Sequence, residues 1–182
     1  MSLRYAILVD LCRGEGTGYE IAKRFQEGVG FSWKASHPQI YSELKKMADM
    51  GWVEFEKIEQ ESKPAKKIYR LTDDGLNSLK LWMDTPAEIP PVRDMFIIKM
   101  TVGDLATPSK LLREVLERKK FTMEKMAIFQ QIEETHYKND NQDPKYKFPQ
   151  LSLRAAIITF EAHLKWFDEL IEYLETLVKS ES

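Results

Sequence analysis

The chain has very little cysteine: Cys12 is the only one among its 182 residues. A single thiol cannot form a disulfide within the chain, which fits a reducing cytoplasm. The N-terminal segment lacks the layout of a signal peptide, and no stretch is apolar for long enough to span a membrane. We therefore expect a cytoplasmic protein without a membrane partner. Because Cys12 lies in an apolar segment, we expect its side chain to be buried.

Histidine is scarce as well, and its placement argues against a metal site. His37, His136 and His163 lie in separate segments, and none has a second ligand at helical spacing. The chain also lacks a glycine-rich phosphate loop and a nucleophile motif. The sequence thus predicts no metal, no cofactor and no catalytic residue. An enzyme is the least favoured of the functions considered.

The chain has no excess of charge of one sign. It carries 27 lysines and arginines against 29 aspartates and glutamates, for a net charge of −2. The two signs also balance within residues 1–85. This balance gives no overall basic signal for nucleic acid, although a local patch matters more than the total.

What the chain does have is an ordered series of start and stop signals between Thr17 and Trp82. Thr17 with Glu20, and Ser36 with Gln39, have the capping-box spacing of helix N-termini. Alternating residues in 53–57 and 67–71 predict two strands around a lysine-bearing turn, and Thr72 then caps another helix. This order is typical of a winged helix-turn-helix, which places one helix in a DNA groove.

The helix after Ser36 is the predicted DNA reader. Its residues Ile40, Leu44 and Met47 fall on one face at helical spacing, which predicts packing against the preceding helix. The opposite face carries polar residues that can bond bases or phosphates. The alternative is that these residues are only the solvated face of an amphipathic helix.

Six short segments carry a resemblance to a known family. They are Tyr5-Ala6-Ile7-Leu8, Gly18-Tyr19-Glu20-Ile21, Ile40-Tyr41-Ser42-Glu43-Leu44, Met50-Gly51-Trp52-Val53, Tyr69-Arg70-Leu71-Thr72 and Asp74-Gly75. Over Leu3 to Trp82 the chain resembles the PadR family of bacterial transcriptional regulators. The resemblance implies that Tyr19 and Tyr41 lie near the DNA backbone, that the wing is basic, and that the C-terminal domain holds a dimer. The wing departs from that pattern because Glu54, Glu56, Glu59 and Glu61 surround its lysines, which leaves its contact with DNA open.

The predicted DNA contacts lie at the start of the second helix, before and along the third helix, and in the wing. They are Tyr19, Lys34, Ser36, His37, Gln39, Tyr41, Ser42, Lys45, Lys46, Lys63, Lys66 and Lys67.

A proline-rich segment, Pro86–Pro91, predicts a linker between a DNA-binding domain (1–85) and a helical dimerisation domain (86–182). The second domain should contain a short helix around Phe96, a long helix from Thr107 to Tyr137, a loop over Lys138–Pro149, and a last helix from about Gln150 to Lys179. The fold class is therefore mostly α with a small β-hairpin wing.

The last helix has a heptad row, in which apolar residues alternate spacings of four and three. Its members are Leu153, Ile157, Phe160, Leu164, Phe167, Ile171, Leu174 and Val178. Such a row favours coiled-coil packing. The row can serve a homodimer interface or pack against the preceding long helix of the same chain, and both remain open.

Trp82, Phe96 and Trp166 are candidates for an effector pocket between the domains, although aromatic residues on helices are more often part of a core. The family resemblance implies a phenolic or other small aromatic effector. Two interpretations of function follow: a dimeric, sequence-specific repressor that binds double-stranded DNA, or a winged-helix protein-interaction module without DNA binding.

Overall fold

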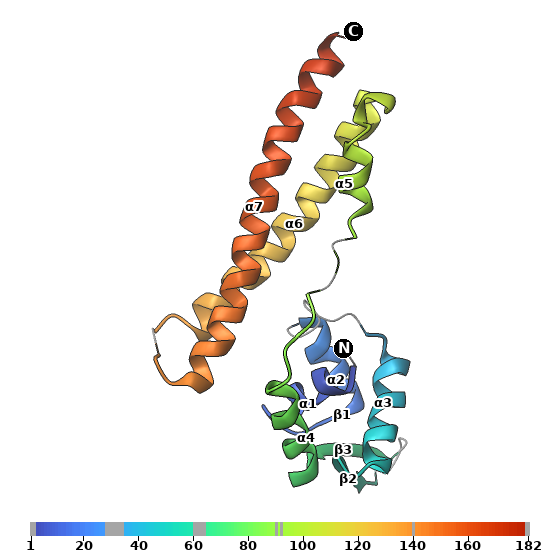
Figure 1. Ribbon diagram of the computed structural model, residues 1–182, viewed down its shortest axis with the longest axis vertical. Coiled ribbons are helices and arrows are strands. Elements are labelled where there is room, and N and C mark those ends of the chain that lie inside the picture. Colours follow the sequence, from blue (N-terminus) through green and yellow to red (C-terminus); the bar gives the residue numbers. More distant parts are fainter. Residues whose placement is uncertain are drawn as a thin grey trace. The chain divides into compact units, whose positions relative to one another are not determined.

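The computed structural model describes residues 3–27, 35–59, 65–89, 91, 93–139 and 141–180, and the side chains of all of these except Gln26 and Glu27. The chain forms two compact units, Met1–Pro91 and Val92–Ser182, which are described here one at a time (Figure 1). The described residues are mostly helical with one small sheet, which confirms the predicted fold class.

The first unit contains four helices and three strands among its described residues. In chain order they are α1 (Leu3–Leu11), β1 (Gly16–Thr17), α2 (Gly18–Glu27), α3 (His37–Asp49), β2 (Val53–Ile58), β3 (Lys66–Leu71) and α4 (Asp73–Met83).

The predicted caps begin these helices. The Thr17 amide donates to Glu20 over 2.7 Å and the Glu20 amide donates back to Thr17 Oγ1 over 3.2 Å. Ser36 and Gln39 form the same reciprocal pair at the start of α3. Thr72 Oγ1 accepts from the Gly75 amide over 3.1 Å at the start of α4. These bonds satisfy amide groups that a helix N-terminus otherwise leaves without partners.

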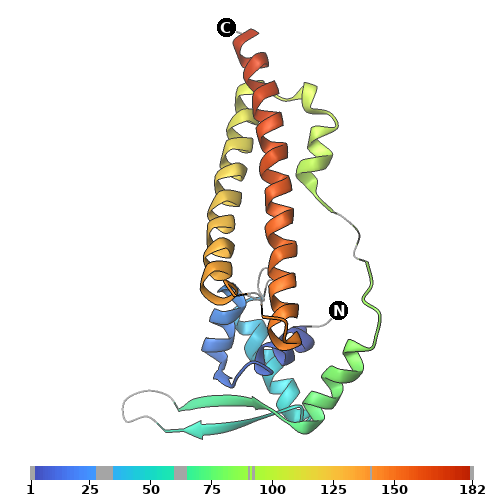
Figure 2. The ribbon, with the colours of Figure 1, turned by 90° about the vertical axis from the view of Figure 1, so that its left-hand side faces the viewer.

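The sheet has the order β1-β3-β2, and all its pairs are antiparallel. Strands β2 and β3 form a hairpin, the wing, which projects beside the helices (Figure 2). The sequence did not predict β1, since a strand of two residues shows no alternation. It pairs Gly16 with Tyr69 and Thr17 with Ile68, and thereby ties the start of α2 to the wing.

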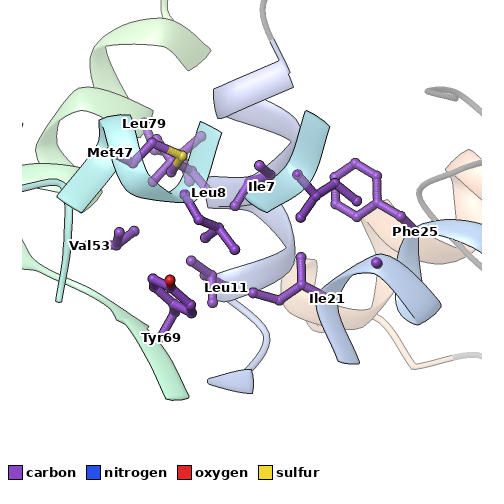
Figure 3. Packing of buried hydrophobic residues seen from close by; sticks show 12 residues of the cluster. Ile7, Leu8, Leu11, Ile21, Phe25, Met47, Val53, Tyr69 and Leu79 are labelled. Atoms are coloured by element: carbon purple, nitrogen blue, oxygen red, sulfur yellow. The ribbon is translucent and has the colours of Figure 1, made fainter. Parts of the chain in front are cut away.

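One hydrophobic core holds the first unit together (Figure 3). Ile40, Leu44 and Met47 have no exposed surface, which confirms the predicted inner face of α3. They pack with side chains of α1, α2, α4 and the sheet: Ile7, Leu8, Leu11, Ile21, Ala22, Phe25, Val53, Tyr69 and Leu79. The prediction of a buried Cys12 was wrong: α1 ends at Leu11, so Cys12 lies in the turn after the helix and is exposed.

Two charged pairs connect the helices of this unit. Arg24 of α2 donates to buried Asp10 of α1 over 2.6 to 3.1 Å, and Arg4 of α1 donates to Glu43 of α3 over 3.0 Å. The buried carboxylates would be costly without these partners.

The second unit is helical. It contains α5 (Met95–Met100), the short 3-10 helix η2 (Gly103–Leu105), α6 (Pro108–His136) and α7 (Pro144–Ser180). The prediction that α7 begins near Gln150 was wrong. The Asp143 side chain accepts from the Lys145 amide, and Pro144 lies at the first helical position, where a missing amide hydrogen is tolerated. Pro149 then lies within the helix and costs it one backbone hydrogen bond.

Helices α6 and α7 lie side by side (Figure 1). Most members of the heptad row belong to two small cores between α5, α6 and α7, and all of them are buried or half-buried within the chain. Of the two roles that the sequence left open for this row, the structure shows the packing against helices of the same chain. In the part of the chain that the structure describes, no helix is both long and apolar enough to cross a membrane.

Candidate nucleic-acid interface

A groove of about 890 Å³ opens on the first unit between the start of α2, the outer face of α3 and the wing. Its lining residues are Thr17, Gly18, Tyr19, Glu20, Tyr41, Lys45, Ala48, Asp49, Phe55, Ala65, Lys66, Lys67 and Tyr69. We call this surface the groove. Of the predicted DNA contacts, Tyr19, Tyr41, Lys45, Lys66 and Lys67 meet here from three separate elements.

Exposed rings and lysines line the groove together. Tyr19, Tyr41 and Phe55 keep large exposed surfaces although they are aromatic. The Lys67 ammonium lies 4.0 Å from the centre of the Phe55 ring, and that ring lies 5.5 Å from the ring of Tyr69. A surface lined by lysines and exposed aromatic rings can bind phosphates through its cations and can pack flat apolar faces against sugars and bases.

Two of the four acidic residues of the wing lie on its other face, whereas Glu59 pairs with Lys57 over 2.8 Å and Glu61 lies outside the described residues. Successive side chains of a strand point to opposite sides, so Glu54 and Glu56 face away from Phe55. There they pair with Arg70, at 3.6 Å and 3.1 Å. The charges of Glu54 and Glu56 are therefore separated from the groove by the alternation of side chains along the strand.

Two carboxylates nevertheless line the groove, Glu20 and Asp49. The hydrogen bonds from the Thr17 amide and hydroxyl, followed by the charge of Lys66, hold the pKa of Glu20 below its usual value. Glu20 therefore stays ionised, and its 3.6 Å pair with Lys66 partly neutralises that lysine. Burial, followed by the nearby Tyr41, raises the pKa of Tyr69, so this phenol keeps its proton.

The remaining predicted contacts on α3 are exposed or half-exposed but do not line the groove. Ser42 and Lys46 face solvent, and His37 lies 6.0 Å from the Tyr19 ring. Gln39 Oε1 already accepts from the Ser36 amide over 2.8 Å and from its hydroxyl over 3.1 Å. A bidentate contact from Gln39 to adenine therefore requires the capping box to open. Lys34 and Lys63 lie outside the described residues.

Sequence reasoning missed Phe55 and Gly18 as groove residues. Phe55 was predicted only as a strand position, and its exposure follows from the hairpin reaching past the core. The only sign of this role in the sequence is that Phe55 is a large aromatic residue flanked by charged residues, in a strand that extends beyond Val53.

The effector candidates divide between the units. Trp82 belongs to the first unit, where it stacks on Tyr5 with ring centres 4.9 Å apart. Phe96 and Trp166 meet in the second unit at 5.7 Å and line a cavity of about 600 Å³. Phe121, Phe160 and Phe167 add further rings to this cavity. The Arg118 guanidinium also lines it and lies 4.0 Å from the centre of the Phe96 ring.

The two units match two family descriptions. Residues 7–81 match the transcriptional regulator PadR-like family, and residues 92–175 match the C-terminal region of virulence activator alpha. Among curated proteins, the chain is 29% identical over 186 residues to the probable transcriptional regulator Rv1176c of Mycobacterium tuberculosis, covering 96% of this chain and 98% of that protein. It is 45% identical over 98 residues to the negative transcriptional regulator PadR of Bacillus subtilis, covering 53% and 54% of the two chains.

Solved structures agree along the whole chain. Bacillus subtilis PadR in complex with operator DNA superposes with a TM-score of 0.79 at 30% identity, covering 94% of this chain and 98% of that one. The Vibrio cholerae virulence activator AphA gives 0.74 at 31% identity, covering 97% and 99%. Bacillus subtilis PadR in complex with p-coumaric acid gives 0.72 at 28% identity, covering 95% and 98%. Identity at this level over nearly complete chains, with the fold and the groove described above, shows that the chain belongs to the PadR family and is a DNA-binding transcriptional regulator rather than an enzyme.

Proposed function

We propose that the protein is a repressor that binds operator DNA as a dimer. In each copy, the groove on the protein surface would contact the sugar–phosphate backbone of the DNA. The groove carries this proposal, since it brings exposed rings and lysines from α2, α3 and the wing to one surface. In this arrangement α3 enters a major groove, which is wide enough for a helix, and the wing reaches the neighbouring minor groove. The backbone between them then passes along Tyr41, Lys45 and Lys67.

The separation of charge in the wing favours DNA over the alternative of a protein-interaction module. A uniformly acidic wing would repel phosphates, but Glu54 and Glu56 are paired with Arg70 on the far face. The negative regulation named for Bacillus subtilis PadR supports repression rather than activation.

The test is a polarisation titration with a labelled duplex from upstream of the protein's own gene, beside a scrambled duplex of equal length. We expect tighter binding to the first duplex and a steep loss of affinity for both with added salt, because phosphate contacts release counterions. Equal, weak binding to the two duplexes at low salt would favour the protein-interaction module.

We propose that a second copy covers an exposed stripe on α7. Its members are Phe148, Leu151, Ala155, Ile158 and Ala162, which continue a heptad spacing on the face turned away from α6. Phe148 is 69% exposed, and Leu151 and Ile158 are each 52% exposed. Such a row of apolar residues in water is typical of an interface, and its alanines allow a close helix approach.

We propose that a small aromatic acid releases the protein from DNA by binding the cavity beside Phe96 and Trp166. The rings would hold an aromatic ligand. Arg118 now pairs with Glu114 over 3.1 Å at the edge of this cavity, and it would share its guanidinium with the carboxylate of the ligand. The structure of Bacillus subtilis PadR with p-coumaric acid supports this class of ligand. The ligand can release the protein from DNA only if it binds the DNA-free arrangement of the protein more tightly than the DNA-bound arrangement.

p-Coumaric acid is the first probe for this cavity. We expect it to quench tryptophan fluorescence and to lower operator affinity, and we expect Trp166→Phe to remove most of the quenching. Quenching without any loss of DNA affinity would show binding without release. A panel of aromatic acids that neither quenches nor releases DNA would remove the effector from the proposal.

A further inference from the structure

Gly18, the first residue of α2, lies directly under the ring of Tyr41 from α3. A side-chain carbon placed on Gly18 would lie 2.4 Å from Tyr41 Cε1 and 2.8 Å from its Cζ, far closer than carbon atoms approach. Among the described residues only Gly51 has a positive φ, so Gly18 is not needed for an unusual backbone conformation. Glycine instead leaves room for the Tyr41 ring, and a larger residue at this position would displace the ring.

The missing side chain of Gly18 allows the observed position of the Tyr41 hydroxyl. Tyr41 is 47% exposed and is not part of the core of the first unit, so other rotamers of its side chain would place the ring in solvent. Its Cζ, which carries the hydroxyl, is one of the atoms nearest Gly18. The Tyr41 ring thus lies at the start of α2, in the groove that Lys66 and Lys67 of the wing also line.

We propose that Gly18 is a positioning residue for DNA binding: its missing side chain lets the Tyr41 ring lie against α2, so that the Tyr41 hydroxyl points at a phosphate in the groove. This inference rests on the proposed DNA-binding face.

The alternative is that Gly18 serves only the fold. Alanine is a better helix former than glycine, and Tyr41 can swing into solvent without opening the core. Gly18→Ala should therefore leave the protein folded and displace only the Tyr41 ring. A purely structural glycine would instead show its effect in the melting temperature.

The experiment is a double-mutant cycle on the full-length protein, measured as operator affinity and melting temperature. The variants are Gly18→Ala, Tyr41→Ala and the two combined, with Tyr41→Phe to remove the hydroxyl alone. The control is Gly14→Ala, because a side-chain carbon there meets nothing within 4 Å.

We expect Gly18→Ala and Tyr41→Phe each to weaken operator binding about tenfold, the loss of one hydrogen bond to a charged group. In the Tyr41→Ala background the space is open, so adding Gly18→Ala should change the affinity less than twofold. The slope of affinity against salt should stay that of the wild type, since a neutral hydroxyl releases no counterion. Gly14→Ala should bind like the wild type.

Additive losses in the cycle would overturn the inference, because Gly18 would then act without Tyr41. The inference would also be overturned if the double variant, with Gly18→Ala and Tyr41→Ala, unfolded while Tyr41→Ala alone stayed folded. Wild-type affinity for Gly18→Ala, with weaker binding by Lys67→Ala, would remove the role of Gly18 and leave the groove in place. If Lys67→Ala and Tyr41→Ala also bound like the wild type, the proposed DNA-binding face itself would be wrong.

Discussion

The two units use their apolar residues differently. In the first unit Ile7, Leu8, Ile21, Ile40, Leu44 and Met47 have no exposed surface and share one core. In the second unit the apolar residues are divided between two smaller cores, and α5, α6 and α7 keep many of theirs in solvent. The exposed apolar side chains of the first unit include the groove rings Tyr19, Tyr41 and Phe55, whereas the second unit exposes the stripe along α7 that we propose a second copy covers. The first unit thus joins one core to an exposed groove, and the second divides its core and exposes the stripe proposed for assembly.

Breaking the core of the first unit should have the largest effect. Leu44→Ala removes a fully buried side chain, so we expect a loss of about 2–5 kcal/mol in the free energy of unfolding of that unit. Urea unfolding followed by circular dichroism measures it. Leu81→Ala, at a side chain that is 72% exposed, is the matched control and should change the value by less than about 0.5 kcal/mol. Equal effects at both positions would contradict the core assignment.

A charge on the exposed stripe should break assembly and spare the fold. We expect Ile158→Glu to weaken the dimer by about a hundredfold or more, because like charges brought together in an interface cost several kcal/mol. Light scattering over a range of concentrations measures the mass, and circular dichroism checks the helices. Thr176→Glu, an exposed substitution outside the stripe, should remain dimeric. A wild-type chain that is monomeric at every concentration would refute the proposed interface.

Removing one groove lysine should have a smaller effect, confined to DNA binding. Lys67→Ala should weaken operator and scrambled DNA alike and lower the salt slope by about one ion. The control is Lys80→Ala on the exposed side of α4, which also removes one positive charge but lies outside the groove, and it should bind DNA like the wild type. A Lys67 variant that loses affinity only for the operator would indicate a base contact rather than a phosphate contact.

The smallest expected effect concerns Glu20. Its pKa is lowered in the folded protein, first by the Thr17 hydrogen bonds, so its contribution to stability is complete above the ordinary glutamate pKa of about 4.3 and is lost as the pH falls below it. Glu20→Gln keeps the capping box but not the charge. We expect urea midpoints of this variant to fall less than those of the wild type between about pH 5 and pH 3. Exposed Glu88→Gln should track the wild type, and identical curves for all three proteins would exclude the effect.

Features set by neighbours in the sequence could be predicted. The capping pairs at Thr17 and Ser36 depend on a three-residue spacing, and the inner face of α3 depends on helical periodicity, so both follow from local chemistry. The end of α1 before Cys12 and the early start of α7 at Pro144 were missed because helix boundaries depend on a few local hydrogen bonds.

Features set by tertiary contact could not be predicted. The pairing of β1 with β3, the pairing of Arg70 with Glu54 and Glu56, and the contact of Gly18 with Tyr41 each join residues far apart in sequence. The heptad row shows the same limit, since periodicity identifies an apolar face but not the helix that covers it.

If one unit binds DNA and the other pairs two copies, the protein should bind an operator duplex as two chains. Sedimentation velocity of the wild type and of Ile158→Glu, each mixed with the duplex, measures the number of chains bound. We expect two chains per duplex for the wild type, and weaker binding of single chains for the variant. A wild type that binds as one chain per duplex, with the same affinity as the variant, would refute the division of roles between the units.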